Sequence, residues 1–163
     1  MMLETTLRYL GIWSGIGCAL FCGYVVLLFR TGLVYTARKQ DGTLKEKIPF
    51  TGYLNASALL LGVVGLQVAA NHLGLGRKAL ELGFVPLLLL NYGHYLVLFL
   101  FDTIVIDGLV LGVWRPAFLE IPPSMGAESM RRHIAASLPV GLAAGIVLAA
   151  MATVISHLAF FVG

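Results

Sequence analysis

The feature that most constrains this chain is a run of 32 residues, 82–113, that contains no lysine or arginine. At about 1.5 Å per residue a helix of that length measures roughly 48 Å, whereas the hydrocarbon core of a bilayer is about 30 Å thick. The run therefore predicts a membrane-spanning helix, yet its interior holds Asn91, His94, Asp102 and Asp107. Charged side chains cost roughly 2.5–3.5 kcal/mol each at mid-bilayer, and they usually face a protein interior, a partner or a water-filled path.

The composition extends this interpretation to the whole chain. Of the 163 residues, 59% are hydrophobic and only 12% are charged, which is typical of a polytopic membrane protein. We expect an all-α fold with a single domain, 1–163, in which four transmembrane helices form a bundle. Each predicted helix exceeds the roughly 20 apolar residues needed to cross a bilayer. The predicted helices cover residues 9–29, 50–72, 84–113 and 134–162.

The basic residues predict an orientation. Eight of the eleven lie in the connecting segments 30–49 and 114–133, and three lie on the other side of the membrane. Because basic residues concentrate in cytoplasmic loops, we expect both segments to be cytoplasmic and both termini to lie outside (N-out, C-out). A bacterial inner membrane is the expected location. The net charge of +3 is modest and lies in loops, so it indicates topology and not a nucleic-acid partner.

Small residues recur at four-residue intervals on two of the predicted helices. Such rows let helix backbones approach closely, and in lipid this packing replaces the missing hydrophobic drive. They are Gly11, Gly15, Ala19 and Gly23 in the first helix and Gly141, Gly145 and Ala149 in the last. Two interpretations stay open: packing within the bundle, or a surface for a homo-oligomer or larger complex.

The predicted orientation sorts the polar residues of the helices into two belts by depth. The belt in the outer half of the membrane contains Gln67, Asn71, His72, Asn91, His94, Ser156 and His157. The belt near the inner surface contains Arg30, Asn55, Ser57, Asp102, Asp107 and Ser137. Polar residues at these depths either hydrogen-bond between helices or take part in function.

The third helix carries the polar face that we expect to line the bundle interior. At about 100° per residue, Asn91, Tyr95 and Asp102 share one side, with His94 on its flank. Asp107 points roughly away from Asp102, so the two carboxylates are not expected to act together.

Each of these two carboxylates needs a partner. Asp107 matches Arg30 in depth, and we expect an ion pair between them. No basic residue of the sequence matches Asp102 in depth. We therefore expect Asp102 to be protonated or hydrogen-bonded to Asn55, to water or to another subunit.

We favour a function as a subunit or accessory component of a membrane complex or homo-oligomer, because the chain is short and rich in small-residue rows. The alternative is a small proton-coupled transporter or channel in which Asp102 is the titrating site. The other candidates for its polar path are His94, Asn91, Asn55 and Tyr95.

A second alternative is a membrane anchor that binds haem b, a quinone or a chlorophyll, since neutral imidazole is a common ligand of haem iron. The histidines considered for this role are His72, His94 and His157. An enzyme is the least favoured class, because the sequence has no nucleophile motif, phosphate-binding loop or Cys/His metal spacing. Asp102 and His94 would be the acid–base pair of an intramembrane lipid enzyme, but an α-helix separates them by roughly 12 Å along its axis.

Overall fold

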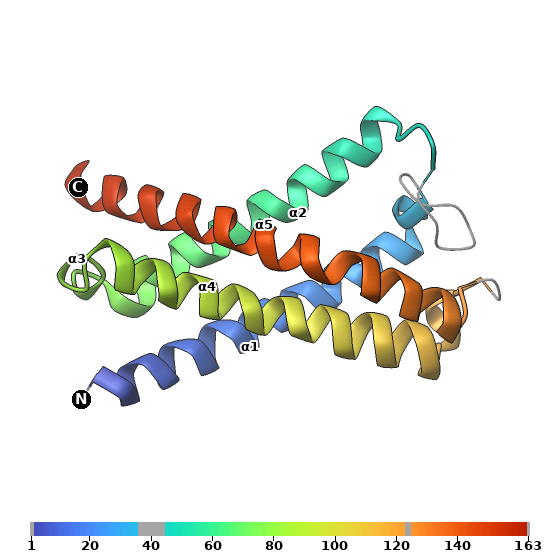
Figure 1. Ribbon diagram of the computed structural model, residues 1–163, viewed down its shortest axis with the longest axis horizontal. Helices are drawn as coiled ribbons and strands as arrows, with labels where there is room; N and C mark the ends of the chain where they lie inside the picture. The colour runs from blue at the N-terminus through green and yellow to red at the C-terminus, as the bar shows by residue number, and fades with distance from the viewer. Residues whose placement is uncertain (1, 36–44, 123–124, 163) are drawn as a thin grey trace. The chain divides into compact units, whose positions relative to one another are not determined.

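The computed structural model of the chain describes residues 2–35, 45–122 and 125–162 (Figure 1). Helices make up 88% of the structure, and none of these residues forms a strand. Within them, four helices are long and apolar enough to cross a membrane. These four are Glu4–Arg30, Phe50–Leu75, Phe84–Trp114 and Ala127–Ala159. The expected all-α fold with four helices capable of spanning a bilayer is therefore confirmed.

Short helical turns follow or connect the long helices. The elements are α1 (Met2–Arg30), the 3₁₀ turn η1 (Leu33–Tyr35), α2 (Phe50–Ala70), the π-helical turn η2 (Asn71–Leu75), α3 (Lys78–Glu81), α4 (Phe84–Leu100), the π-helix η3 (Phe101–Trp114), the 3₁₀ turn η4 (Ala117–Leu119) and α5 (Ala127–Val162).

The first and last helices begin seven residues earlier than predicted. Each has a glutamate in its first turn, Glu4 and Glu128, where a negative charge favours the helix N-terminus.

The described residues belong to two compact units. Unit 1 comprises Met1–Cys18, Leu60–Leu98 and Leu142–Gly163, and unit 2 comprises Ala19–Leu59 and Phe99–Gly141. All four long helices contribute residues to both units. The buried apolar core of unit 1 contains Tyr9, Ala70, Leu75, Ala79 and Leu87. That of unit 2 contains Val25, Phe29, Ile106, Leu111, Leu119, Met125 and Met130.

The third long helix changes its geometry along its length. It is α-helical as α4 and continues from Phe101 to Trp114 as the π-helix η3. Hydrogen bonds in a π-helix join residues five apart, as the bond from the Arg115 N–H to the Val110 carbonyl oxygen does (2.8 Å). Some side chains of η3 that lie five residues apart have similar exposure. The exposed side chains include Ile104, Leu109 and Trp114, and the buried ones include Ile106 and Leu111.

This π-helix changes the expected relation between the two carboxylates of the third span. An α-helix would turn Asp102 and Asp107 to roughly opposite sides, as the sequence analysis assumed. The wider turns of a π-helix rotate the chain less per residue, so Asp102 and Asp107 lie closer to one side of η3 than they would in an α-helix. The periodicity assumed for this segment was therefore wrong, because it was that of an α-helix.

Candidate functional site

Unit 1 contains a cluster of buried polar side chains. Six of them are 0% exposed, and in addition Ser14 is 5% and Tyr9 is 4% exposed. The six come from α2, η2, α4 and α5, and Tyr9 and Ser14 come from α1. They are Gln67, Asn71, Asn91, His94, Thr153 and Ser156. Burial of polar groups is unfavourable unless they form hydrogen bonds, so the partners of each group decide what the cluster can do.

The first set of hydrogen bonds is centred on Asn71 in η2. Its Oδ1 accepts from the Tyr9 hydroxyl at 2.8 Å, and its Nδ2 donates to the Ser156 Oγ at 2.9 Å. Both ends of this amide are thus used, and the bonds join α1, η2 and α5. Such interhelical bonds contribute about 0.6 kcal/mol each on average in a membrane protein, with a maximum of about 1.7 kcal/mol.

The second set is centred on Asn91 in α4. The Gln67 Nε2 donates to the Asn91 carbonyl oxygen at 2.7 Å, and the Asn91 Nδ2 donates to the Thr153 Oγ1 at 3.0 Å. The Thr153 hydroxyl in turn donates to the carbonyl oxygen of Ala149 at 2.7 Å. These bonds join α2, α4 and α5, so the two sets together connect elements of all four long helices.

Several buried polar atoms of the cluster have no hydrogen-bond partner among the described residues. They are the Ser14 Oγ, the Gln67 Oε1, the Asn91 Oδ1 and both ring nitrogens of His94. The Trp13 backbone lies near the His94 ring but does not meet the geometry of a hydrogen bond. The rings of Tyr9 and His94 pack edge to face, with their centroids 6.0 Å apart. The cluster therefore combines satisfied interhelical bonds with an unsatisfied part around His94.

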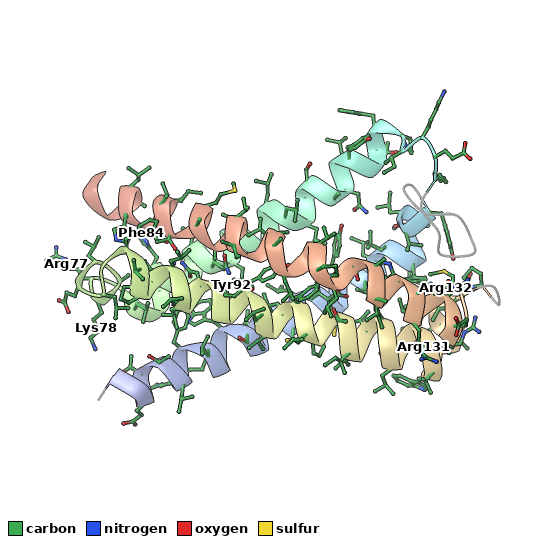
Figure 2. All side chains as sticks on the ribbon, in the orientation of Figure 1. Arg77, Lys78, Phe84, Tyr92, Arg131 and Arg132 are labelled. Carbon is green, nitrogen blue, oxygen red and sulfur yellow. The ribbon has the colours of Figure 1, made fainter. Side chains whose placement is uncertain are left out.

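Other predicted path residues lie in different surroundings. Tyr95 is buried in unit 1 and stacks on Tyr92, with ring centroids 6.4 Å apart (Figure 2 labels Tyr92). In unit 2, the Asn55 Oδ1 accepts from the Tyr24 hydroxyl at 2.7 Å. Asp102 is half-buried in η3. Asn91, His94 and Tyr95 thus belong to unit 1, whereas Asn55 and Asp102 belong to unit 2.

Asp107 has a partner that the sequence analysis did not consider. Its Oδ2 lies 3.3 Å from the Nε2 of His133, on the part of α5 that belongs to unit 2. The expected partner, Arg30, has an exposed side chain at the end of α1, and the described residues show no Arg30–Asp107 ion pair. Arg30 and Asp107 match in depth, but depth in the membrane does not determine which helices face each other.

The three histidines considered as cofactor ligands have three different environments. His72 is exposed, His94 is fully buried, and His157 is half-buried with its Nδ1 3.0 Å from the Thr153 carbonyl oxygen. The ring of His157 also lies 5.9 Å from that of Phe84, which Figure 2 labels. Within the described ranges no group of three His, Cys, Asp or Glu side chains is placed to hold a metal ion.

The two rows of small residues differ in what covers them. A Cβ added to Gly145 would meet the ring of Tyr95, and one added to Gly141 would meet the ring of Phe99. The row on α5 is therefore packed by aromatic side chains of the chain itself. On α1, a Cβ added to Gly11, Gly15 or Gly23 meets nothing within 4 Å, and Ala19 is also exposed.

Sequence reasoning missed four residues of these sites: Tyr9, Tyr24, Thr153 and His133. Thr153 carried a usable signal, since it precedes Ser156 and His157 by three and four residues and so shares their helix face. Two tightly packed glycines were also missed. An added Cβ would lie 2.6 Å from Leu98 at Gly17 and would meet Trp13 at Gly74.

Comparison with known protein families, characterised proteins and solved structures gives no match.

Proposed function

We propose that the chain is a subunit of a homo-oligomeric membrane assembly. In this proposal it forms a four-helix transmembrane bundle in a bacterial inner membrane, with both termini outside. The observation that carries the proposal is the uncovered row of small residues on α1, Gly11, Gly15, Ala19 and Gly23.

The contrast between α1 and α5 supports an interface on α1. Both helices carry small residues at four-residue intervals, but aromatic rings pack against the row on α5. A row of small residues on a membrane helix allows another helix backbone to approach closely. The same surface on two copies can pair around a two-fold axis, since such an interface uses one patch on both subunits.

The distribution of charge supports the proposed orientation. Eight of the eleven basic residues fall within the sequence ranges of unit 2, and three fall within those of unit 1. Arg131 and Arg132, in the first turns of α5, have exposed side chains, as do Arg77 and Lys78 near α3 (Figure 2). The excess of basic residues in the sequence ranges of unit 2 favours a cytoplasmic location for the segments 30–49 and 114–133.

Cys22 provides a direct test of the α1 interface. It is exposed, and at about 100° per residue it lies within about 20° of both Gly11 and Gly15 around the helix axis. In a Cys18→Ser background, membranes treated with a short thiol cross-linker should yield a dimer through Cys22. The Cys22→Ser variant should yield none.

The matched pair of variants is Gly15→Leu on α1 and Gly65→Leu on α2, since both glycines are exposed and neither meets a neighbour within 4 Å. Gly15→Leu should reduce Cys22 cross-linking and the oligomer fraction in single-molecule photobleaching, whereas Gly65→Leu should change neither. A monomeric wild type, or equal effects of the two substitutions, would contradict the proposal.

A small proton-coupled transporter is the second candidate. The observation that favours it is the presence of ionisable groups within the apolar spans, with His94 in unit 1 and the Asp107–His133 pair in unit 2. Proton relays in pumps and transporters use Asp and His side chains. The test is proton flux into proteoliposomes, in which Asp102→Asn and His94→Gln should each slow the flux and Gly65→Leu should not.

A further inference from the structure

We propose that the buried polar cluster of unit 1 is a binding site for a water molecule, held by Ser14, Gln67, Asn91 and His94. This inference goes beyond the proposed assembly and does not depend on it. It starts from four side chains, each at most 5% exposed, that each have at least one polar atom without a hydrogen-bond partner among the described residues.

The orientation of the Gln67 amide is determined by its neighbour. Its nitrogen donates to the Asn91 carbonyl oxygen, and a carbonyl oxygen can only accept. The amide therefore cannot be turned over without losing this bond. Its Oε1 is left as a buried acceptor that needs a donor.

The orientation of the Asn91 amide follows in the same way. The hydrogen of the Thr153 hydroxyl is already donated to the Ala149 carbonyl, so the Thr153 oxygen must accept from Asn91. Asn91 therefore presents its nitrogen to Thr153, and its Oδ1 is a second buried acceptor without a donor. The contrast is Asn71, equally buried, whose oxygen is satisfied by Tyr9.

His94 and Ser14 supply the remaining hydrogen-bonding groups. A neutral imidazole offers one N–H donor and one acceptor, and a hydroxyl offers one donor. His94 follows Asn91 by three residues, so the two share one side of α4. Serine in a helix usually donates to the carbonyl four residues earlier, but the Ser14 hydroxyl has no such partner.

The packing of α1 places Ser14 beside the segment of α2 that contains Gln67 and the segment of α4 that contains His94. The Tyr9 ring meets the ring of His94, and a Cβ on Gly17 would lie 2.6 Å from Leu98 and 2.8 Å from Leu66. Ser14 lies between these two contacts along α1. Leu66 is the residue before Gln67, and Leu98 is one turn beyond His94.

Water is the ligand whose hydrogen bonds match this set of groups. Water donates two hydrogen bonds and accepts two, so one molecule can donate to the acceptors of Gln67 and Asn91 and accept from the Ser14 hydroxyl and the N–H of His94; the second ring nitrogen of His94 is not used by this water. Buried waters typically make about three hydrogen bonds to polar groups that are otherwise unsatisfied. Since the four side chains are enclosed, a bound water here would be separate from bulk solvent.

The test is solid-state NMR on isotope-labelled protein in lipid bilayers, with dipolar transfer from water protons to side-chain nitrogens. A variant with His72, His133 and His157 all changed to Gln leaves His94 as the sole histidine. We expect transfer to the ring nitrogens of His94 and to the Asn91 Nδ2. Asn71, equally buried but fully bonded, is the internal control and should show no transfer at the same mixing time.

Absence of transfer to His94 in a folded sample would overturn the proposal. Thermal unfolding of the single variants provides a second readout if the triple variant does not fold. With a bound water, His94→Phe and Ser14→Ala should each lower Tm, because each removes a hydrogen bond of the water. Without one, removal of an unsatisfied buried group should raise Tm, and that result would also overturn the proposal.

Discussion

The close packing of Gly145 against aromatic rings gives the sharpest prediction on stability. A Cβ at this position would overlap the ring of Tyr95, which is itself 8% exposed and therefore has little room to move. Forcing one extra carbon into a packed interior typically costs about 1–3 kcal/mol. Replacement of glycine by alanine in a helix also changes the intrinsic helix propensity, by about 0.8–1.0 kcal/mol in favour of alanine.

A second glycine of unit 1 separates these two contributions. Gly65 in α2 is exposed, and a Cβ there would meet nothing within 4 Å. Gly65→Ala therefore gains the helix propensity of alanine without the steric cost of a Cβ that overlaps a neighbour. The free energies of unfolding of Gly145→Ala and Gly65→Ala should differ by about 1–3 kcal/mol, with Gly145→Ala the less stable.

The assay is reversible unfolding in mixed micelles by titration with a denaturing detergent, followed by far-UV circular dichroism. A double-mutant cycle identifies the cause, because Tyr95→Leu removes the ring that the new Cβ would meet. In the Tyr95→Leu background, Gly145→Ala should lose most of its effect. Equal stability of Gly145→Ala and Gly65→Ala, or additivity of the Gly145 and Tyr95 changes, would refute the reasoning.

Three further predictions concern hydrogen bonds and charge. Asn71→Leu removes the hydrogen bonds to Tyr9 and Ser156 and should lower the free energy of unfolding by about 1–2 kcal/mol. Tyr9→Phe removes only one of these bonds and should lower it by about half as much. Both values come from the same titration with denaturing detergent. His133→Leu removes the contact between the His133 Nε2 and the Asp107 Oδ2 and should lower Tm, whereas Arg30→Gln at an exposed position should not; equal losses in the two variants would refute this pairing. Burial raises the pKa of Tyr35, which follows α1 outside the apolar spans. The contribution of this side chain to stability is therefore present below the ordinary tyrosine pKa of about 10 and is lost as the pH rises through the raised pKa. Above about pH 10 the Tm of Tyr35→Phe should thus fall less than that of the wild type.

The fold could be predicted from the sequence to the level of its helices. Long apolar runs can satisfy their backbone groups in lipid only as helices or closed barrels, so the four spans follow from length and composition. The ends of α1 and α5 were placed too far inside, because the polar residues from Glu4 and Glu128 onward continue each helix beyond its apolar run.

The candidate site could be predicted only in part. Polar residues such as Asn71, Asn91 and His94 are conspicuous in an apolar chain, and the structure places them in one unit. Their partners could not be predicted, because helix rotation decides whether Tyr9 or His133 faces a given side chain. The same limit applies to the glycines: the sequence gives identical spacing to the rows on α1 and α5, and only packing distinguishes them.

The π-helix also affects how the third span fits a membrane. A helix with wider turns advances less along its axis for each residue, so Phe84–Trp114 is shorter than its 31 residues would be as an α-helix. A hydrophobic segment that exceeds the local bilayer thickness must otherwise tilt, kink or thicken the bilayer, at a cost of fractions of a kcal/mol per Å of mismatch. The wide turns of η3 thus take up part of the excess length within the helix itself, which reduces the hydrophobic mismatch of this span.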